Sequence, residues 1–215
     1  MKNNLKILFV GNSLTYYNFM PNAVKAMFEA AGISAECVMV TASGKCLDYQ
    51  AAAADVKYNI LYGNYDYIII QGKAGGFETE PFLAGGEKIM KELVAKTDSK
   101  PILYNVWCLK GHMKDQKILD DAYAELSRRT GAPVAPAGRV FHRARRIHGI
   151  PELYREDGNH PTAAGTYVVA AAVFYAITKR DRAIRLPDSD GYYEKSGLTL
   201  SQAEKIHAIA CAENK

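Results

Sequence analysis

The sequence contains no uninterrupted apolar run of the roughly 18 residues that a membrane-spanning helix needs. Its first apolar run, residues 7–10, is too short for the core of a signal peptide, and no cleavage site follows it. The most apolar later stretch begins at Tyr167 and ends at Lys179. We therefore expect a cytoplasmic protein that has no membrane partner.

Cysteine is scarce and scattered. The four cysteines form no CxxC pair; they are Cys37, Cys46, Cys108 and Cys211. Zinc sites normally show paired cysteines or histidines at short spacing, so this pattern argues against a metal centre. It is compatible with reduced thiols in a cytoplasm. We expect no metal and no cofactor.

Neither sign of charge dominates. There are 27 Lys and Arg against 23 Asp and Glu, which gives a net charge of +4 and a pI near 8.7. A nucleic-acid-binding protein usually carries a stronger, clustered positive charge, so no nucleic-acid partner is expected. The densest basic stretch, residues 139–148, is interpreted as a solvated helix face. Residues 72–76, GKAGG, lack the spacing of a phosphate-binding P-loop.

Strand-like and helix-like segments alternate along the chain. Apolar runs predict strands at residues 5–11, 35–41, 65–72, 101–107 and 132–138. Helices are predicted at residues 20–31, 82–96, 114–130 and 162–179, and a final helix is expected to start with a capping box of Ser201 and Glu204. This alternation predicts a doubly wound α/β sandwich with a central parallel sheet of five strands. We expect one domain over residues 1–215, with a core of about residues 5–180 and a C-terminal extension at about 181–215.

Ser13 follows the first strand directly, at the edge where doubly wound sheets bind their ligands. A serine at this place can simply cap a helix. It can also be a nucleophile, which requires a base and an acid elsewhere in the chain. Asp157 and His160 supply such a pair, because a tight turn can bring the carboxylate to one ring nitrogen and leave the other nitrogen free.

Together these motifs resemble those of the SGNH, or GDSL-type, hydrolases, a family of serine esterases. The family has Gly-Asp-Ser-Leu after its first strand, and here residues 11–14 read GNSL. It has Asp-x-x-His before its last core helix, and here residues 157–160 read DGNH. The resemblance implies a flavodoxin-like three-layer α/β/α fold. It also implies that Ser13 is the nucleophile, His160 the general base and Asp157 the residue that orients His160.

The resemblance further implies an oxyanion hole with three donors: the N–H of Ser13, the N–H of a glycine after the second strand, and an asparagine side chain after the third. Gly44 matches the glycine, although it can equally be an ordinary loop residue. No asparagine follows the third strand, and Gln71 is the side-chain amide nearest in sequence to the expected position. A strand-end glutamine bonded only to the backbone is the alternative. Asn12 in place of the family's Asp is a second departure.

The predicted function is hydrolysis of a carboxylic ester that carries a short acyl group. The substrate is expected to be a carbohydrate or another small molecule, by analogy with family members. Two alternatives remain open: an acyltransferase that uses the same acyl-enzyme, and a non-catalytic flavodoxin-like protein that binds a phosphate or another ligand at the first helix. Trp107, the only tryptophan, is expected at the end of the fourth strand, either packed in the core or stacked on a sugar ring.

Overall fold

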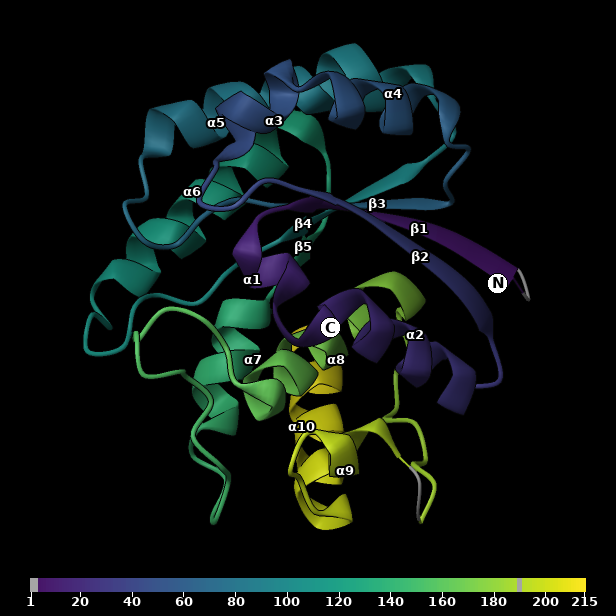
Figure 1. The fold of residues 1–215 in the computed structure, drawn as a ribbon, viewed down its shortest axis with the longest axis vertical. Coiled ribbons are helices and arrows are strands. Elements are labelled where there is room, and N and C mark those ends of the chain that lie inside the picture. The colour runs from purple at the N-terminus through teal and green to yellow at the C-terminus, as the bar shows by residue number, and fades with distance from the viewer. Residues whose placement is uncertain (1–3, 189–190) are drawn as a thin grey trace.

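The computed structural model describes residues 4–188 and 191–215. Its centre is a parallel sheet of five strands in the order β2-β1-β3-β4-β5 (Figure 1). The strands are β1 (Asn4–Gly11), β2 (Ser34–Thr41), β3 (Tyr67–Gln71), β4 (Lys100–Tyr104) and β5 (Val134–Ala135). This order is the flavodoxin-like one, and its direction reverses next to β1. The predicted fold class is confirmed.

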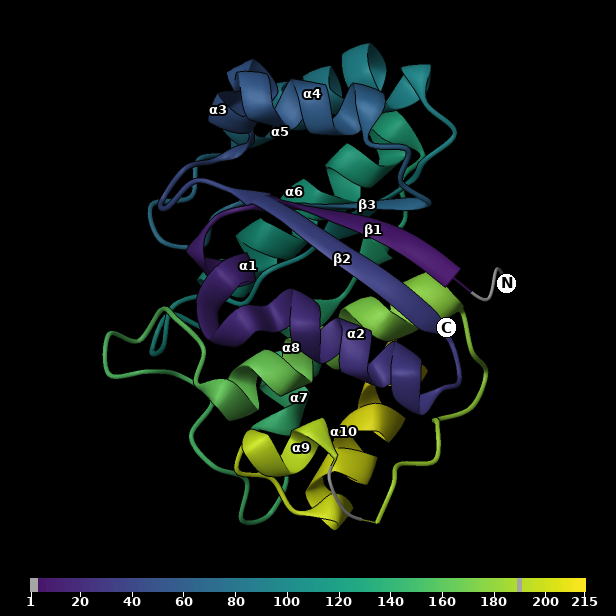
Figure 2. The ribbon, with the colours of Figure 1, turned by 45° about the vertical axis from the view of Figure 1, so that its right-hand side comes forward.

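Helices cover both faces of the sheet (Figures 1 and 2). One layer contains α3 (Leu47–Ala52), α4 (Ala54–Tyr62), α5 (Thr79–Lys88) and α6 (Asp115–Thr130), and α5 continues through a π turn (Ile89–Leu93) and a 3-10 turn (Val94–Lys96). The other contains α2 (Met20–Ala30), α7 (Ala137–Ala144), α8 (Ala163–Thr178), α9 (Tyr192–Lys195) and α10 (Leu200–Glu213). The short helix α1 (Ser13–Tyr16) and the 3-10 turn Tyr17–Phe19 connect β1 to α2.

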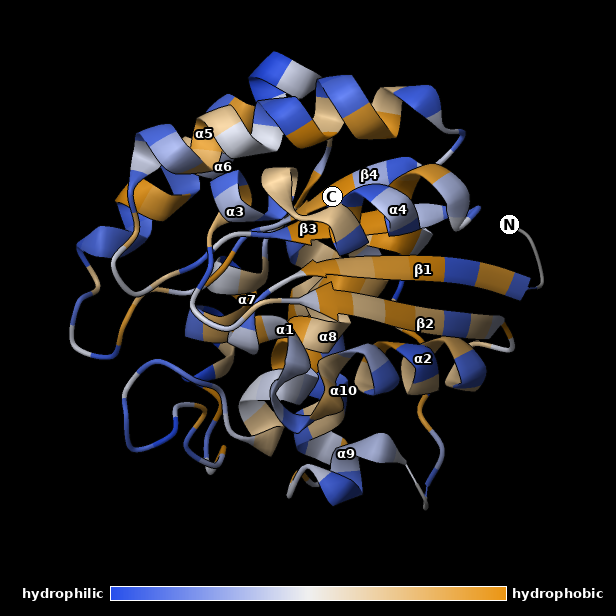
Figure 3. Cartoon of the chain, turned by 45° about the horizontal axis from the view of Figure 1, so that its top comes forward, coloured by the Kyte–Doolittle hydropathy of each residue, from blue (hydrophilic) through white to orange (hydrophobic). Residues whose placement is uncertain are grey.

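The core is built from the apolar strands and from α8. Figure 3 shows β1 and β3 as largely hydrophobic, as expected for parallel strands that are covered on both faces. Helix α8 is buried on every side, because α2, α7 and α10 all pack against it. The C-terminal helix α10 is therefore part of the helical layer. None of the helices formed by residues 4–188 and 191–215 is long and apolar enough to cross a membrane.

Three local predictions were wrong in their boundaries. Strand β4 ends at Tyr104, three residues before Trp107. Strand β5 has only two residues, because proline on either side, Pro133 and Pro136, lacks the N–H that would extend the ladder. The capping box of the final helix begins two residues earlier than predicted and is formed by Thr199 and Gln202, with both of its reciprocal hydrogen bonds present.

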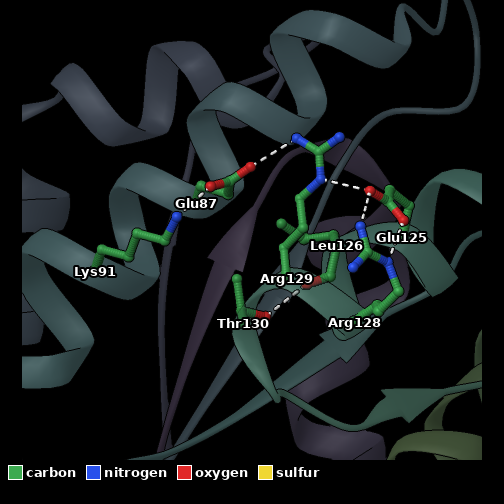
Figure 4. A network of polar contacts seen from close by, with 7 residues as sticks. All are labelled: Glu87, Lys91, Glu125, Leu126, Arg128, Arg129 and Thr130. Carbon is green, nitrogen blue, oxygen red and sulfur yellow. Dashed lines mark hydrogen bonds and ion pairs between the residues drawn. The ribbon is translucent and has the colours of Figure 1, made fainter.

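A surface network of ion pairs joins α5 to α6 (Figure 4). Arg129 contacts Glu87 on α5 and Glu125 on its own helix, each at 2.7 Å, while Lys91 pairs with Glu87 and Arg128 with Glu125. Hydrogen bonds from Arg128 and Arg129 lower the pKa of Glu125 to about 2. Exposed pairs of this kind are screened by solvent and contribute little to stability, so the network mainly orients the two helices.

Candidate active site

The turn after β1 presents Ser13 at the first position of α1. Asn12 caps this helix by accepting a hydrogen bond from the N–H of Leu14 at 3.1 Å. Gly11 precedes the cap, and a Cβ there would collide with the side chains of Gln71 and Thr15. The glycine is therefore required by close packing, and the turn is held rigidly under the nucleophile.

The structure brings Ser13, His160 and Asp157 together. The Ser13 Oγ lies 2.8 Å from Nε2 of His160, and Nδ1 of His160 lies 2.6 Å from Oδ2 of Asp157. With its proton on Nδ1, His160 donates to the carboxylate and leaves Nε2 to accept the proton of the serine hydroxyl. This is the geometry of a Ser-His-Asp triad.

Hydrogen bonds hold the Asp157 carboxyl in its ionised form. Its Oδ1 accepts from the backbone N–H groups of Asn159 and His160, both at 2.9 Å. Partial burial favours the neutral acid, but these bonds and the one from the His160 ring outweigh burial and bring the pKa of Asp157 down to about 2. The carboxylate therefore stays charged at every pH at which the protein would work.

The loop that carries His160 is fastened on several sides. Arg155 N–H donates to the His160 carbonyl at 2.8 Å, and Tyr154 forms a short bridge with Pro161. On the side of the sheet, Trp107 Nε1 donates to the Asn159 carbonyl at 3.0 Å. Thr162 then caps α8 by accepting the N–H of Gly165. His160 is thus placed by a loop that is bonded to the core.

The loop after β2 brings Gly44 to the nucleophile turn. Its neighbours are tied there: Ala42 N–H donates to the Gly11 carbonyl at 3.0 Å, and Tyr16 OH donates to Ser43 Oγ at 3.2 Å. Gly44 has a left-handed φ of 68°. In the part of the chain that the structure describes, no hydrogen bond from its N–H to the protein is found.

Gln71, predicted as the third oxyanion donor, is bonded to the turn that carries Ser13. Its side chain is 1% exposed. Oε1 accepts from the N–H of Asn12 at 3.0 Å and from Thr15 Oγ1 at 2.8 Å, while Nε2 donates to Asn12 Oδ1 at 3.1 Å. Both ends of the amide are therefore engaged with residues 12–15, so Gln71 supports this turn, and its part as an oxyanion donor stays a prediction.

Trp107 belongs to the core. It is fully buried and its ring stacks on Phe141, with centroids 4.7 Å apart and planes 10° apart. Of the two alternatives for this residue, packing is the one that the structure shows. Its contribution to the site is the hydrogen bond to the loop of His160.

Sequence reasoning missed Tyr17. Its ring lies parallel to the His160 ring, with centroids 4.2 Å apart and an interplanar angle of 19°. Tyr17 follows the last residue of α1 and has left the helical conformation. Nothing in the sequence signals this contact, because the two rings lie on segments far apart in the chain.

Among residues 4–188 and 191–215, no group of three His, Cys, Asp or Glu side chains is arranged to hold a metal ion. Two further histidines, one half-buried and one fully buried, lie away from Ser13. His142 contacts Gln116 and Cys108, and His207 lies between Tyr167 and Tyr175. Burial lowers the pKa of each of these histidines to about 4.

The sequence matches no protein-family model and no curated protein. The chain resembles several solved structures. A DUF4886 family protein from Bacteroides uniformis has a TM-score of 0.73 and 15% identity, and the match covers 99% of this chain and 96% of that one. An acetylxylan esterase from Geobacillus stearothermophilus has a TM-score of 0.67 and 15% identity, covering 83% of this chain and 97% of that one, and TesA has a TM-score of 0.66 and 12% identity, covering 81% and 98%. At these identities the likeness concerns the fold. The chain therefore shares the three-layer α/β/α fold of these solved structures.

Proposed function

We propose that this protein is a serine hydrolase that cleaves carboxylic esters through an acyl-enzyme on Ser13. The observation that carries the proposal is the continuous hydrogen-bonded chain from Ser13 Oγ through the His160 ring to Asp157. A serine hydroxyl is a weak nucleophile by itself, and an adjacent base that a third group orients is what activates it. The similar fold of an acetylxylan esterase supports the same class of reaction.

In the proposed acylation step, Ser13 Oγ attacks the ester carbonyl carbon while His160 Nε2 takes the hydroxyl proton. The ionised Asp157 stabilises the imidazolium that forms. When the tetrahedral intermediate collapses, the bond to the alcohol breaks and Nε2 returns the proton to the leaving oxygen. Water, activated by His160 in the same way, then hydrolyses the acyl-enzyme and releases the carboxylic acid.

Two backbone donors are proposed for the oxyanion. The N–H of Ser13 is at the first position of α1, where a helix leaves its N–H groups without intrahelical partners and favours negative charge. The N–H of Gly44 is the second donor, because its loop is bonded to the nucleophile turn on both sides. Backbone donors fixed in this way stabilise charge as it develops on the carbonyl oxygen.

For the substrate, we propose a short acyl ester, such as an acetyl group, on a carbohydrate or another small molecule. Two observations support this substrate class: the fold similarity to an acetylxylan esterase, and the resemblance of the motifs around Ser13 and His160 to those of SGNH hydrolases. An acyltransferase would use the same acyl-enzyme and replace water by an acceptor alcohol. A purely phosphate-binding role finds less support, since it gives no part to the bonded Asp157–His160 pair.

The proposal is tested with nitrophenyl esters of increasing acyl length and with a fluorophosphonate, which reacts covalently with activated serines. We expect turnover and a mass increase of one phosphonyl group on the wild-type protein. Ser13→Ala should abolish both, and His160→Gln should lower kcat by roughly 10⁴-fold or more. Release of a free acid identifies a hydrolase, whereas acyl transfer to added alcohol alone identifies a transferase. A wild-type protein that neither turns over any ester nor reacts with the fluorophosphonate contradicts the proposal.

A further inference from the structure

Hydrogen bonds hold both nitrogens of the His160 ring. Nδ1 lies 2.6 Å from Asp157 Oδ2, and Nε2 lies 2.8 Å from Ser13 Oγ. Both contacts are made at the edge of the ring and leave its faces uncovered. A side chain packed against one face would further restrict rotation of the ring out of this alignment.

Tyr17 makes that contact. Its ring lies against the face of His160, with centroids 4.2 Å apart and planes inclined by only 19°. We propose that Tyr17 is a positioning residue that holds the plane of the His160 ring and so aims Nε2 at the Ser13 hydroxyl. This inference rests on the proposed function, because it assigns Tyr17 a part in activating the same nucleophile.

The backbone around Tyr17 is tied to the histidine loop. Asn18 and Phe19, the next two residues, both adopt left-handed conformations, with φ of 49° and 55°. Residues with a Cβ rarely adopt this conformation, so it persists only where other contacts enforce it. Asn18 Nδ2 donates to the Pro161 carbonyl and to Thr166 Oγ1, each at 2.9 Å. Tyr17 is therefore fixed relative to the residue that follows His160.

The electrostatics of the stack also favour the proposed reaction. The face of an aromatic ring is electron-rich and attracts a cation that lies against it. His160 is a cation while it holds the serine proton, so the Tyr17 ring stabilises that state more than the neutral one. The Arg155 guanidinium lies 5.3 Å from the centroid of the same ring, and the Arg155 N–H donates to the His160 carbonyl. The arginine thus helps to hold Tyr17 in place from the same loop.

The test compares Tyr17→Leu, which removes the ring, with Tyr17→Phe, which keeps it. Tyr62→Leu serves as a matched control, because Tyr62 is 69% exposed on α4 in the other helical layer. For each protein we would measure the rate of fluorophosphonate labelling of Ser13, kcat and KM on the best nitrophenyl ester, and the melting temperature. We expect Tyr17→Leu to lower kcat and the labelling rate by about 5- to 30-fold at a nearly constant KM. Tyr17→Phe should keep most of both rates, and the Tyr62 control should match the wild type.

The outcomes separate the two proposals. A wild-type protein that labels while Tyr17→Leu labels equally fast overturns the positioning role alone. The same is true if Tyr17→Leu loses rate only in proportion to a lowered melting temperature, or if Tyr17→Phe loses as much as Tyr17→Leu. A wild-type protein that does not label at Ser13 overturns the proposed function, and the positioning role with it.

Discussion

Asn12 is the position at which restoring the residue of the resembled family should be most harmful. The motif of that family has Asp here, and Asn12→Asp changes only one nitrogen to oxygen. In the structure, Asn12 Oδ1 accepts from Leu14 N–H and from Gln71 Nε2, both at 3.1 Å. Its Nδ2 donates to the carbonyls of Lys45 at 3.0 Å and Gly72 at 3.3 Å. A carboxylate can keep the first two bonds, but it turns the last two into contacts between electronegative oxygens.

The size of the effect follows from these four bonds. Losing one intramolecular hydrogen bond costs about 1 kcal/mol, and a buried acceptor left without a donor costs about 1–3 kcal/mol. Asn12 is 1% exposed and its bond to Gly72 is buried, so water cannot replace that donor. We therefore expect Asn12→Asp to lower the free energy of unfolding by roughly 3–5 kcal/mol at pH 7. The loss should shrink as the pH falls, because a protonated carboxyl can donate to one of the two carbonyls.

The assay is urea denaturation of the wild type and the variant at pH 7 and pH 5, with Asn22→Asp as a matched control. Asn22 is exposed in the first turn of α2, so the same chemical change there should leave stability nearly unaltered. An Asn12→Asp protein within about 1 kcal/mol of the wild type at pH 7 refutes the reasoning. So would a destabilisation that does not diminish at pH 5, because the effect would then not arise from the charge.

The remaining predictions concern the oxyanion loop, the histidine loop and the core. Gly44→Ala should lower kcat about tenfold, because the left-handed φ of 68° disfavours a Cβ and displaces the N–H; steady-state kinetics on the best ester would measure this. Trp107→Phe should destabilise the protein by about 1–2 kcal/mol in denaturation, since it keeps the stack but leaves the Asn159 carbonyl without its donor. His207 is buried with a pKa of about 4, whereas an unfolded histidine takes up its proton near pH 6.5. Stability should therefore fall by up to about 3 kcal/mol between pH 6.5 and pH 4, and a flat profile there would contradict this.

The sequence predicts those parts of the fold that depend on residues close together in the chain. Apolar runs located all five strands, and Gly131 ends α6 in the left-handed conformation that favours glycine. The proximity of Asp157 and His160 could be expected because they share one short motif. Contacts within each motif fix its local geometry: Ser13 starts a helix, and the Asp157 carboxylate accepts the N–H of His160.

The contacts that the sequence did not reveal join residues that are far apart in the chain. Gln71 ends β3, and its side chain bonds to Asn12, 59 residues earlier. Tyr17 meets His160 only because the segment between α7 and α8 returns to the turn after β1. Composition and periodicity carry no information on which way a buried amide faces. The direction of such hydrogen bonds emerges only when both partners are in place.

The two departures from the family's pattern, Asn12 and Gln71, are better understood as one change than as two. The N–H of Asn12 and the hydroxyl of Thr15 both donate to Gln71 Oε1, which fixes the orientation of that amide, so Nε2 must face Asn12. The acceptor it meets is Asn12 Oδ1, and this in turn directs Asn12 Nδ2 toward the loops after β2 and β3. A carboxylate at position 12 would have no proton for those loops. The nucleophile turn is therefore supported by two neutral amides that bond to each other, and its support does not change with pH. In this arrangement the proposed stabilisation of the oxyanion falls to the backbone N–H groups of Ser13 and Gly44.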